Sequence, residues 1–442
     1  MVDRQLVAKN GNKQSQLLFF NNYLLSLHKT AKDMKRFTRL FAIVALALAS
    51  IACTETQQPI PEDLRGSWSG EIEGLGLAIV MHLEDTCTMD SPDQGVTGIP
   101  ATVKQLRDNS IKVKFVGIPG NFTGSLQGDS LIGKFSQMGM KMRLAMGRGP
   151  LVRYRPQTPV PPFPYDTEEV SFKHDGISLG GTLASPEKCR PEQTTAVVFV
   201  SGSGQQNRDE TLMDHRPFAV IADALARGGI ASLRYDDRGY GSSGGVFEAA
   251  TTYDFAEDAR AALRFLRARG FKKVGVIGHS EGGVIAFMMA ADSVGTPDFI
   301  VSLAGMADRG DSTLFRQMSK MIELQGAPKK LADFAAKVSM RKVMKQKNVW
   351  MECFLGLEPA QYIAAMKCPC LALNGSKDTQ VIPEYNLSKI EVLCPSADCR
   401  LYDGLNHLFQ HCTTGLSAEY GHIEETFAPE VLDDIVAWLR ER

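Results

Sequence analysis

The chain has 442 residues, of which 44% are hydrophobic and 22% are charged. This composition is typical of a folded globular protein and excludes collagen-like, disordered and polytopic membrane proteins. Because 49 Lys and Arg residues offset 50 Asp and Glu residues, leaving a net charge of -1, the charge gives no reason to expect nucleic acid as a partner. With about 150 residues per domain as a prior, the length predicts two or three domains.

A short apolar run, residues 40–52, follows three basic residues near the N-terminus. A membrane-spanning helix needs about 20 apolar residues, whereas the apolar part of a signal peptide needs only about 7 to 15. Residues 1–52 are therefore predicted to be an N-terminal extension and signal peptide, and the protein to be exported. Translation from Met34, directly before Lys35 and Arg36, would give a signal of ordinary length.

Cys53 follows the tripeptide Ser-Ile-Ala, residues 50–52, and this pattern resembles the lipid-attachment motif of bacterial lipoproteins. We expect lipid attachment at Cys53, with residues 53–63 as a tether, so that the protein lies in the bacterial cell envelope. Ordinary cleavage of the signal, or an uncleaved anchor, are the alternatives. A lipid on Cys53 would be the only membrane link that the sequence indicates.

Residues 64–155 are rich in glycine and in short alternating segments, such as residues 66–72, 77–83 and 111–116. Alternation with period two predicts antiparallel strands, and glycine-containing turns between them favour a small β-meander or barrel. No catalytic set is recognisable here. Residues 156–166 are rich in proline and are predicted to be a stiff linker between domains.

Residues 167–442 follow a different pattern, in which apolar runs alternate with helical periods. The runs at residues 196–200, 230–235, 274–277, 299–303 and 371–373 are typical of strands buried on both faces. Alternating strands and helices predict a doubly wound, mostly parallel α/β sheet. An insert at about residues 306–366 has a helical composition and could form a cap over a site.

A Gly-His-Ser-Glu-Gly segment, residues 278–282, lies between a predicted buried strand and an apolar helix. The pattern G-x-S-x-G in this context is typical of a sharp turn that presents a serine hydroxyl, because the flanking glycines leave room for the turn. Ser280 is therefore the predicted nucleophile. A turn that is merely rich in glycine is the alternative.

A serine nucleophile needs a histidine base and a carboxylate that orients the histidine. In this architecture the expected order along the chain is serine, acid, histidine. Asp378 follows the strand at residues 371–373, and His407 follows the last strand in a Gly-Leu-Asn loop. We predict Asp378 as the acid and His407 as the base, with Asp403 as the rival acid.

The other histidines near the predicted site are given no chemical role. His279, next to the nucleophile, is expected to be a packing neighbour, while His411 and His422 are expected to be surface or packing residues. The charged segment Asp236-Asp237-Arg238 follows a predicted strand and is expected to brace a glycine-rich turn.

The negative oxygen that develops during acyl transfer needs two backbone N–H donors. One donor is expected from Glu281, the residue after the nucleophile. The second should follow the first buried strand of the domain, within residues 201–204, Ser-Gly-Ser-Gly. Ser203 is the predicted donor there, and Gly202 is the alternative.

These motifs resemble the α/β-hydrolase superfamily, and within it the serine-aminopeptidase-like branch that includes EstD-type bacterial esterases. The resemblance covers about residues 167–442 and is carried by residues 203–210, 236–241, 278–283, 373–378 and 405–410. It implies hydrolysis of short acyl esters through an acyl-enzyme on Ser280, with His407 as base and then acid. Ser201 departs from the pattern, because many relatives carry histidine there. No metal, nucleotide or other cofactor is implied.

Three functions are compatible with these features. An exported carboxylesterase acting on small-molecule acyl esters is favoured, because the whole acyl-transfer set is present in order. A peptidase or amidase of the same fold is the first alternative, since the triad does not separate ester from amide. A surface binding lipoprotein with a vestigial hydrolase domain is the second.

Overall fold

The computed structural model describes residues 59–73, 76–94, 96–106, 110–137, 140–345 and 348–442. The predicted signal peptide and the predicted lipid site at Cys53 lie outside these residues. The chain divides into two compact units, the first ending at Arg153 and the second beginning at Tyr154. None of the helices within the described ranges is long and apolar enough to cross a membrane.

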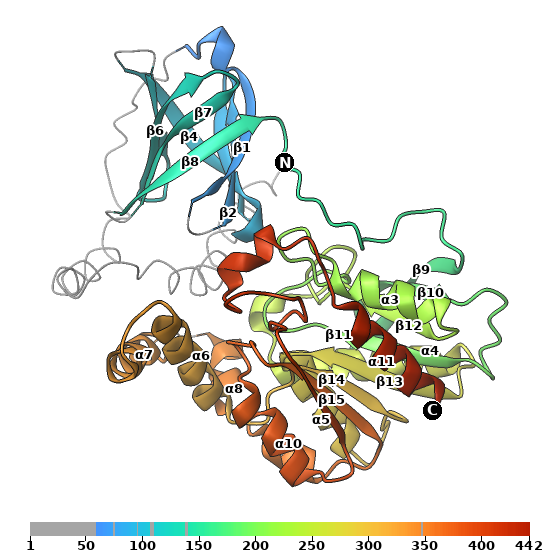
Figure 1. Ribbon diagram of the computed structural model, residues 1–442. Coiled ribbons are helices and arrows are strands. Elements are labelled where there is room, and N and C mark those ends of the chain that lie inside the picture. Colours follow the sequence, from blue (N-terminus) through green and yellow to red (C-terminus); the bar gives the residue numbers. More distant parts are fainter. Residues whose placement is uncertain (1–58, 74–75, 95, 107–109, 138–139, 346–347) are drawn as a thin grey trace. The chain divides into compact units, whose positions relative to one another are not determined.

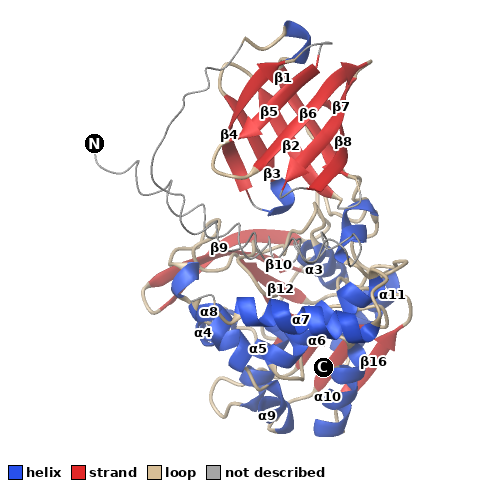
Figure 2. Ribbon diagram, turned by 90° about the vertical axis from the view of Figure 1, so that its left-hand side faces the viewer, coloured by secondary structure: helices blue, strands red, loops and turns tan. Residues whose placement is uncertain are grey.

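The first unit is a closed barrel of antiparallel strands, drawn in red in Figure 2. Each strand pairs with its neighbours in sequence, and β8 pairs with β1 to close the barrel. This confirms the predicted small antiparallel β domain. The strands are β1 (Gly66–Ile72), β2 (Leu77–Leu83), β3 (Cys87–Ser91), β4 (Val96–Gln105), β5 (Ser110–Phe115), β6 (Gly120–Gln127), β7 (Ser130–Gln137) and β8 (Met140–Arg148).

The barrel interior is filled by apolar side chains from alternate strand positions. Trp68, Phe122 and Phe135 are buried there, and Trp68 Nε1 donates a hydrogen bond of 2.8 Å to Leu64 O. Alternation of inward apolar and outward polar residues is what a small closed barrel requires. The first unit therefore has its own hydrophobic core.

The second unit contains an eight-stranded sheet with the order β16-β15-β14-β13-β11-β12-β10-β9. The pairs among β11 to β16 are all parallel, whereas β10 pairs antiparallel with both β9 and β12. This confirms the predicted mostly parallel sheet. The strands are β9 (Asp166–His174), β10 (Ile177–Ser185), β11 (Thr195–Val200), β12 (Ala231–Tyr235), β13 (Lys273–His279), β14 (Ile300–Leu303), β15 (Cys370–Gly375) and β16 (Asp398–Tyr402).

Helices cover both faces of this sheet (Figure 1). Alternate strand residues such as Val197, Phe199 and Ile277 form one core cluster with α3 (Pro217–Arg227) and α11 (Pro429–Arg440). The helices α4 (Thr252–Ala268), α5 (Glu281–Ala291) and α10 (Leu387–Leu393) pack against the sheet without joining this cluster. Strands buried on both faces explain why their sequences are continuous apolar runs.

Helix α4 shows how the sequence sets an element's limits. It begins after Thr251, whose backbone N–H donates 2.8 Å to the Asp254 carboxylate in a capping box. It ends just before Gly270, which adopts a positive φ of 98°. The amphipathic period between these signals buries one face against the sheet.

The insert between β14 and β15 is helical, as predicted for a cap. It contains α6 (Gly310–Leu324), α7 (Lys329–Val343), α8 (Val349–Gly356) and α9 (Pro359–Ala364). Trp350 and Phe354 of α8 are buried, with ring centroids 5.3 Å apart. Helix α8 is the part of the insert that reaches the candidate site described below.

The start of the proline-rich segment is fixed to the second unit. Arg155 donates hydrogen bonds of 2.9 Å to the backbone oxygens of Met213 and Gly421. The Gln157 side-chain amide donates 2.7 Å to Phe427 O. This stretch of the chain is therefore held by side-chain contacts within the second unit.

Candidate active site

Ser280 lies in a sharp turn between β13 and α5. Its backbone has φ 54° and ψ -112°, a left-handed conformation that a residue with a side chain rarely adopts. A Cβ atom on Gly278 would lie 2.1 Å from Gly282 O, and one on Gly282 would lie 2.1 Å from Val200 O. Both glycines are therefore sterically required, and the turn holds the serine at the carboxyl end of a central strand.

The structure brings Asp378 and His407 together in a buried pair. His407 Nδ1 lies 2.7 Å from Asp378 Oδ2, and the two residues are only 4% and 2% exposed. The other carboxylate oxygen of Asp378 accepts the backbone N–H groups of Gln380 (2.8 Å) and Val381 (2.9 Å). The carboxylate is therefore fixed, and it orients His407 with Nε2 free to accept a proton.

The loop that carries His407 is held by a buried asparagine. Asn406 Oδ1 accepts the backbone N–H groups of Leu408 (2.9 Å) and Gln410 (3.0 Å), so the side chain closes the turn around the histidine. Asp403, the rival acid, instead accepts the Ser376 hydroxyl at 2.9 Å. The structure thus places Asp378, and not Asp403, against His407.

Ser280 and His407 lie at the same end of the sheet. A Cβ on Gly202 would lie 3.3 Å from Ser280 Cβ and 3.4 Å from His279 Nδ1, and the His279 and His407 ring centroids are 4.7 Å apart. Within the described part of the chain, no hydrogen bond joins the Ser280 hydroxyl to the His407 ring. Such a bond often forms at full strength only in the substrate complex.

Two backbone N–H groups are free beside Ser280. Those of Glu281 and Ser203 have no acceptor among the described residues, whereas the Gly202 N–H donates 2.6 Å to Glu210 Oε1. Glu281 is the first residue of α5, so its N–H also lies at the positive end of the helix dipole. These are the two N–H groups that the sequence predicts as donors to a developing oxyanion.

The Glu281 side chain is a feature that sequence analysis missed, because only its backbone was assigned a role. Its buried carboxyl accepts the hydroxyls of Thr252 (2.6 Å) and Ser203 (2.8 Å) and, from α8, the Trp350 Nε1–H at 3.0 Å. Burial raises the pKa of Glu281, and these three hydrogen bonds oppose the shift. One carboxyl group therefore ties the cap to the segment that carries Ser203.

His279 is buried beside the nucleophile, and both of its ring nitrogens also lie within hydrogen-bond distance of an acceptor. Its Nδ1 lies 2.9 Å from Glu210 Oε1, and its Nε2 lies 3.1 Å from the backbone oxygen of His407. Glu210 has a positive φ of 51° and was given no role from the sequence. The only signal for it was its position in the stretch 203–210 that resembles the hydrolase family.

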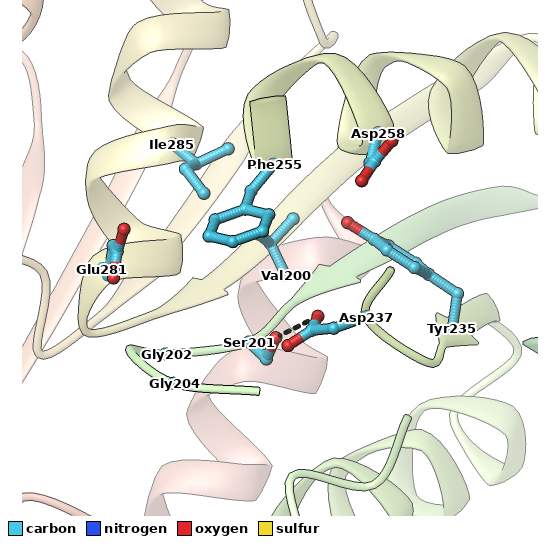
Figure 3. Close-up of a pocket in the computed structure, with 10 residues that line it drawn as sticks. All are labelled: Val200, Ser201, Gly202, Gly204, Tyr235, Asp237, Phe255, Asp258, Glu281 and Ile285. Carbon is cyan, nitrogen blue, oxygen red and sulfur yellow. Dashed lines mark hydrogen bonds between the residues drawn. The ribbon is translucent and has the colours of Figure 1, made fainter. Parts of the chain in front are cut away.

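A cavity is lined in part by the glycine-rich segment that follows β11 (Figure 3). Asp237 and Ser201 contact each other at its edge, because the Ser201 hydroxyl donates 2.8 Å to Asp237 Oδ1. The Gln206 N–H donates 2.8 Å to Asp237 Oδ2. The lining residues are Val200, Ser201, Gly202, Gly204, Tyr235, Asp237, Phe255, Asp258, Glu281 and Ile285.

The charged neighbours of Asp237 are held in ion pairs. Arg208 Nη2 lies 2.8 Å from Asp236 Oδ2, and Arg238 Nε lies 2.7 Å from Asp258 Oδ2. These pairs fix the segment after β12, in keeping with the structural role expected for it. Asp237 itself faces no cation at this distance among the described residues.

Burial raises the pKa of Asp237 to about 8, against the two hydrogen bonds that lower it. An unfolded aspartate has a pKa of about 3.9, so the folded protein binds the extra proton between about pH 4 and 8. The contribution of this proton to the free energy of unfolding is fully present below about pH 4. Between about pH 4 and 8 the contribution falls by about 1.4 kcal/mol per pH unit. The Asp237→Asn variant mimics the neutral acid and does not lose this contribution. Its free energy of unfolding, measured by denaturant unfolding, should therefore rise relative to that of the wild type as the pH rises to 8.

Asp236→Asn is the matched control for this measurement. Despite burial, the hydrogen bonds from Arg208 and Ser242 lower the pKa of Asp236 to about 2. Its ionised form therefore stabilises the fold above the unfolded pKa, and this contribution is lost only as the pH falls toward 2. Asp236→Asn should be less stable than the wild type at neutral pH. Unfolding curves of Asp237→Asn that run parallel to the wild type at every pH would contradict the assignment.

Comparisons with known proteins agree with this architecture. A family model described as serine aminopeptidase, S33, matches residues 213–411, a range that contains Ser280, Asp378 and His407. Esterase EstD of Thermotoga maritima is 25% identical over 291 residues, covering 61% of this chain and 68% of the relative.

Solved structures also match the chain. An esterase of Pyrococcus furiosus is 19% identical, covers 66% of this chain and 99% of its own, and has a TM-score of 0.43. Proline iminopeptidase of Mycobacterium smegmatis is 14% identical, covers 62% of this chain and 98% of its own, and has a TM-score of 0.43. The family match and the esterase relative indicate a hydrolase. The second unit has the α/β-hydrolase fold and resembles the serine-aminopeptidase-like branch of that superfamily.

Proposed function

We propose that the protein is an exported serine hydrolase that cleaves short-chain carboxylic esters through an acyl-enzyme on Ser280. The observation that carries the proposal is the buried Asp378–His407 pair, 2.7 Å apart, at the end of the sheet where Ser280 is held in its turn. This is the arrangement that converts a serine hydroxyl into a nucleophile.

In the proposed reaction the Ser280 oxygen attacks the ester carbonyl carbon, while His407 Nε2 takes the hydroxyl proton. The carbonyl oxygen becomes an oxyanion facing the N–H groups of Ser203 and Glu281. His407 then gives the proton to the leaving alcohol as the ester C–O bond breaks. A water molecule, deprotonated by His407, attacks the acyl-enzyme and releases the carboxylic acid.

Two observations bear on the choice between ester and amide. The curated relative is an esterase, and this favours esters. The matching family model is named after aminopeptidases, so a peptidase or amidase is the second candidate. The two functions differ in how the leaving group is protonated and in how the cap binds the acyl side.

A matched pair of substrates separates these candidates. We expect the purified protein to hydrolyse p-nitrophenyl esters with kcat/KM greatest for short acyl chains, because buried Trp350 and Phe354 of the cap limit the space near Glu281. The p-nitroanilide of an amino acid should be cleaved at least about a hundredfold more slowly than the matched ester. A faster anilide reaction would show a peptidase instead.

Export is part of the proposal. The basic residues and apolar run before Cys53 support a signal peptide, and Cys53 is the proposed lipid-attachment residue. The substrate would then be a small acyl ester that reaches the cell envelope. The nearly neutral chain gives no reason to include nucleic acid among its partners.

A further inference from the structure

Both ring nitrogens of His279 face hydrogen-bond acceptors. Nε2 lies 3.1 Å from the backbone oxygen of His407, and a carbonyl oxygen only accepts, so Nε2 carries a hydrogen. Nδ1 lies 2.9 Å from Glu210 Oε1. An ionised carboxylate also only accepts, so Nδ1 carries a hydrogen whenever Glu210 is charged.

Hydrogen-bond donors surround the Glu210 carboxyl group. The same oxygen, Oε1, accepts the Gly202 N–H at 2.6 Å, so two N–H groups point at one atom. The side chains of His279 and Glu210 are only 8% and 7% exposed, and an unpaired charge there would be costly. Burial lowers the pKa of His279, but attraction and hydrogen bonding to Glu210 outweigh it and raise the pKa overall.

We propose that His279 is a doubly protonated positioning residue. With Glu210 it fixes the relative positions of the three segments that carry Ser203, Ser280 and His407. The inference rests on the proposed roles of Ser280 and His407. Through Glu210 the pair holds Gly202, next to Ser203, and through Nε2 it holds the His407 backbone. His279 itself is joined to Ser280, so one ion pair fixes the oxyanion segment, the nucleophile and the base.

The pair also sets the charge around the base. The charged or titratable groups that act on His279 are Glu210, His407 and Asp378. When His407 accepts the Ser280 proton, a second imidazolium forms with its ring centroid 4.7 Å from that of His279. Glu210 and Asp378 supply one negative charge for each of the two imidazolium groups, so the cluster becomes neutral at that step.

The protonation state can be measured without any activity. In the full chain labelled with 15N-histidine, we expect one ring that keeps both nitrogens protonated above the ordinary histidine pKa of about 6.5. That signal should be absent from His279→Asn. In Glu210→Gln it should change to that of a singly protonated ring, because the counter-charge is gone. A singly protonated His279 in the wild type would overturn the proposal even if the enzyme is an active serine hydrolase.

Two histidine variants separate the two hydrogen bonds. Asparagine places its amide near the Nδ1 position and glutamine near Nε2, so His279→Asn keeps the Glu210 bond and His279→Gln keeps the His407 bond. Each should lower kcat about ten- to a hundredfold with little change in KM, because the segments lose their alignment. Each should also move the acidic limb of the kcat/KM profile to higher pH, because a cation near His407 is removed while Glu210 remains.

His411→Asn is the control, because this histidine is 56% exposed and pairs with Glu425 at the surface. It should leave both kcat and the acidic limb as in the wild type. Loss of activity in the His279 variants with no movement of the acidic limb would show a purely structural role and contradict the proposal. An inactive wild-type protein with a doubly protonated His279 would instead contradict only the proposed function.

Discussion

Ser280→Ala is expected to lower kcat for a short acyl ester by a factor on the order of 10⁶, while the protein folds normally. The loss should be large because the proposed acyl-enzyme forms on the Ser280 oxygen. Alanine keeps the Cβ atom and the backbone N–H that donates 2.8 Å to Leu303 O, so the turn should keep its backbone conformation. Steady-state kinetics on the wild type and variant, with unfolding curves for both, provide the measurement.

Labelling with a fluorophosphonate probe gives an independent readout of the same serine. The wild type should be labelled at Ser280, and Ser280→Ala should not be labelled. Ser396→Ala, at an exposed position before β16, is the control and should behave as the wild type. If Ser280→Ala kept more than about one per cent of the activity, the nucleophile would have to be another residue.

Asp378→Asn is expected to reduce kcat by about 10⁴, the second largest effect. Asparagine would keep an oxygen for the Gln380 and Val381 N–H groups and turn its NH₂ group toward His407 Nδ1. That contact would force His407 into the tautomer in which Nε2 carries the proton and cannot act as a base. Measurement of kcat from saturation kinetics, with unfolding curves for both proteins, tests this.

Asp403→Asn is the matched comparison, since Asp403 was the rival acid. Its carboxylate accepts the Ser376 hydroxyl, and a change there should alter kcat by less than about threefold. The opposite ranking of the two variants would identify Asp403 as the acid. Equal and small effects in both would remove the acid from the proposed mechanism.

The strands of the second unit were predictable because each is a continuous apolar run between turn signals. Val197 and Phe199 pack toward α3 and α11, and Val198 between them faces the other side, so the whole run is buried. The barrel was predictable for the opposite reason, because alternation with period two shows one buried face. In both units the local sequence is sufficient to reveal the pattern of burial.

The set Ser280, Asp378 and His407 was suggested by order and context, and the structure places the last two in contact. The roles of Glu210 and Trp350 could not be predicted, since each depends on a contact with a residue 69 positions away. A buried glutamate has no periodicity or motif of its own. What distinguishes it is the set of donors around it, and only the folded chain brings those donors together.

The contacts of Glu281 suggest how the cap is held. Trp350 of α8 and Ser203 both donate to its carboxyl group, so a hydrogen bond holds α8 against the residue that follows Ser280. Lifting α8 would leave a buried acceptor short of one donor, at a cost of about 1–3 kcal/mol. Binding of a bulky acyl chain that needs this movement would be weakened by that free energy, whereas binding of a short chain would not. Substrate length would then be selected by the strength of one indole hydrogen bond as well as by the room above Ser280.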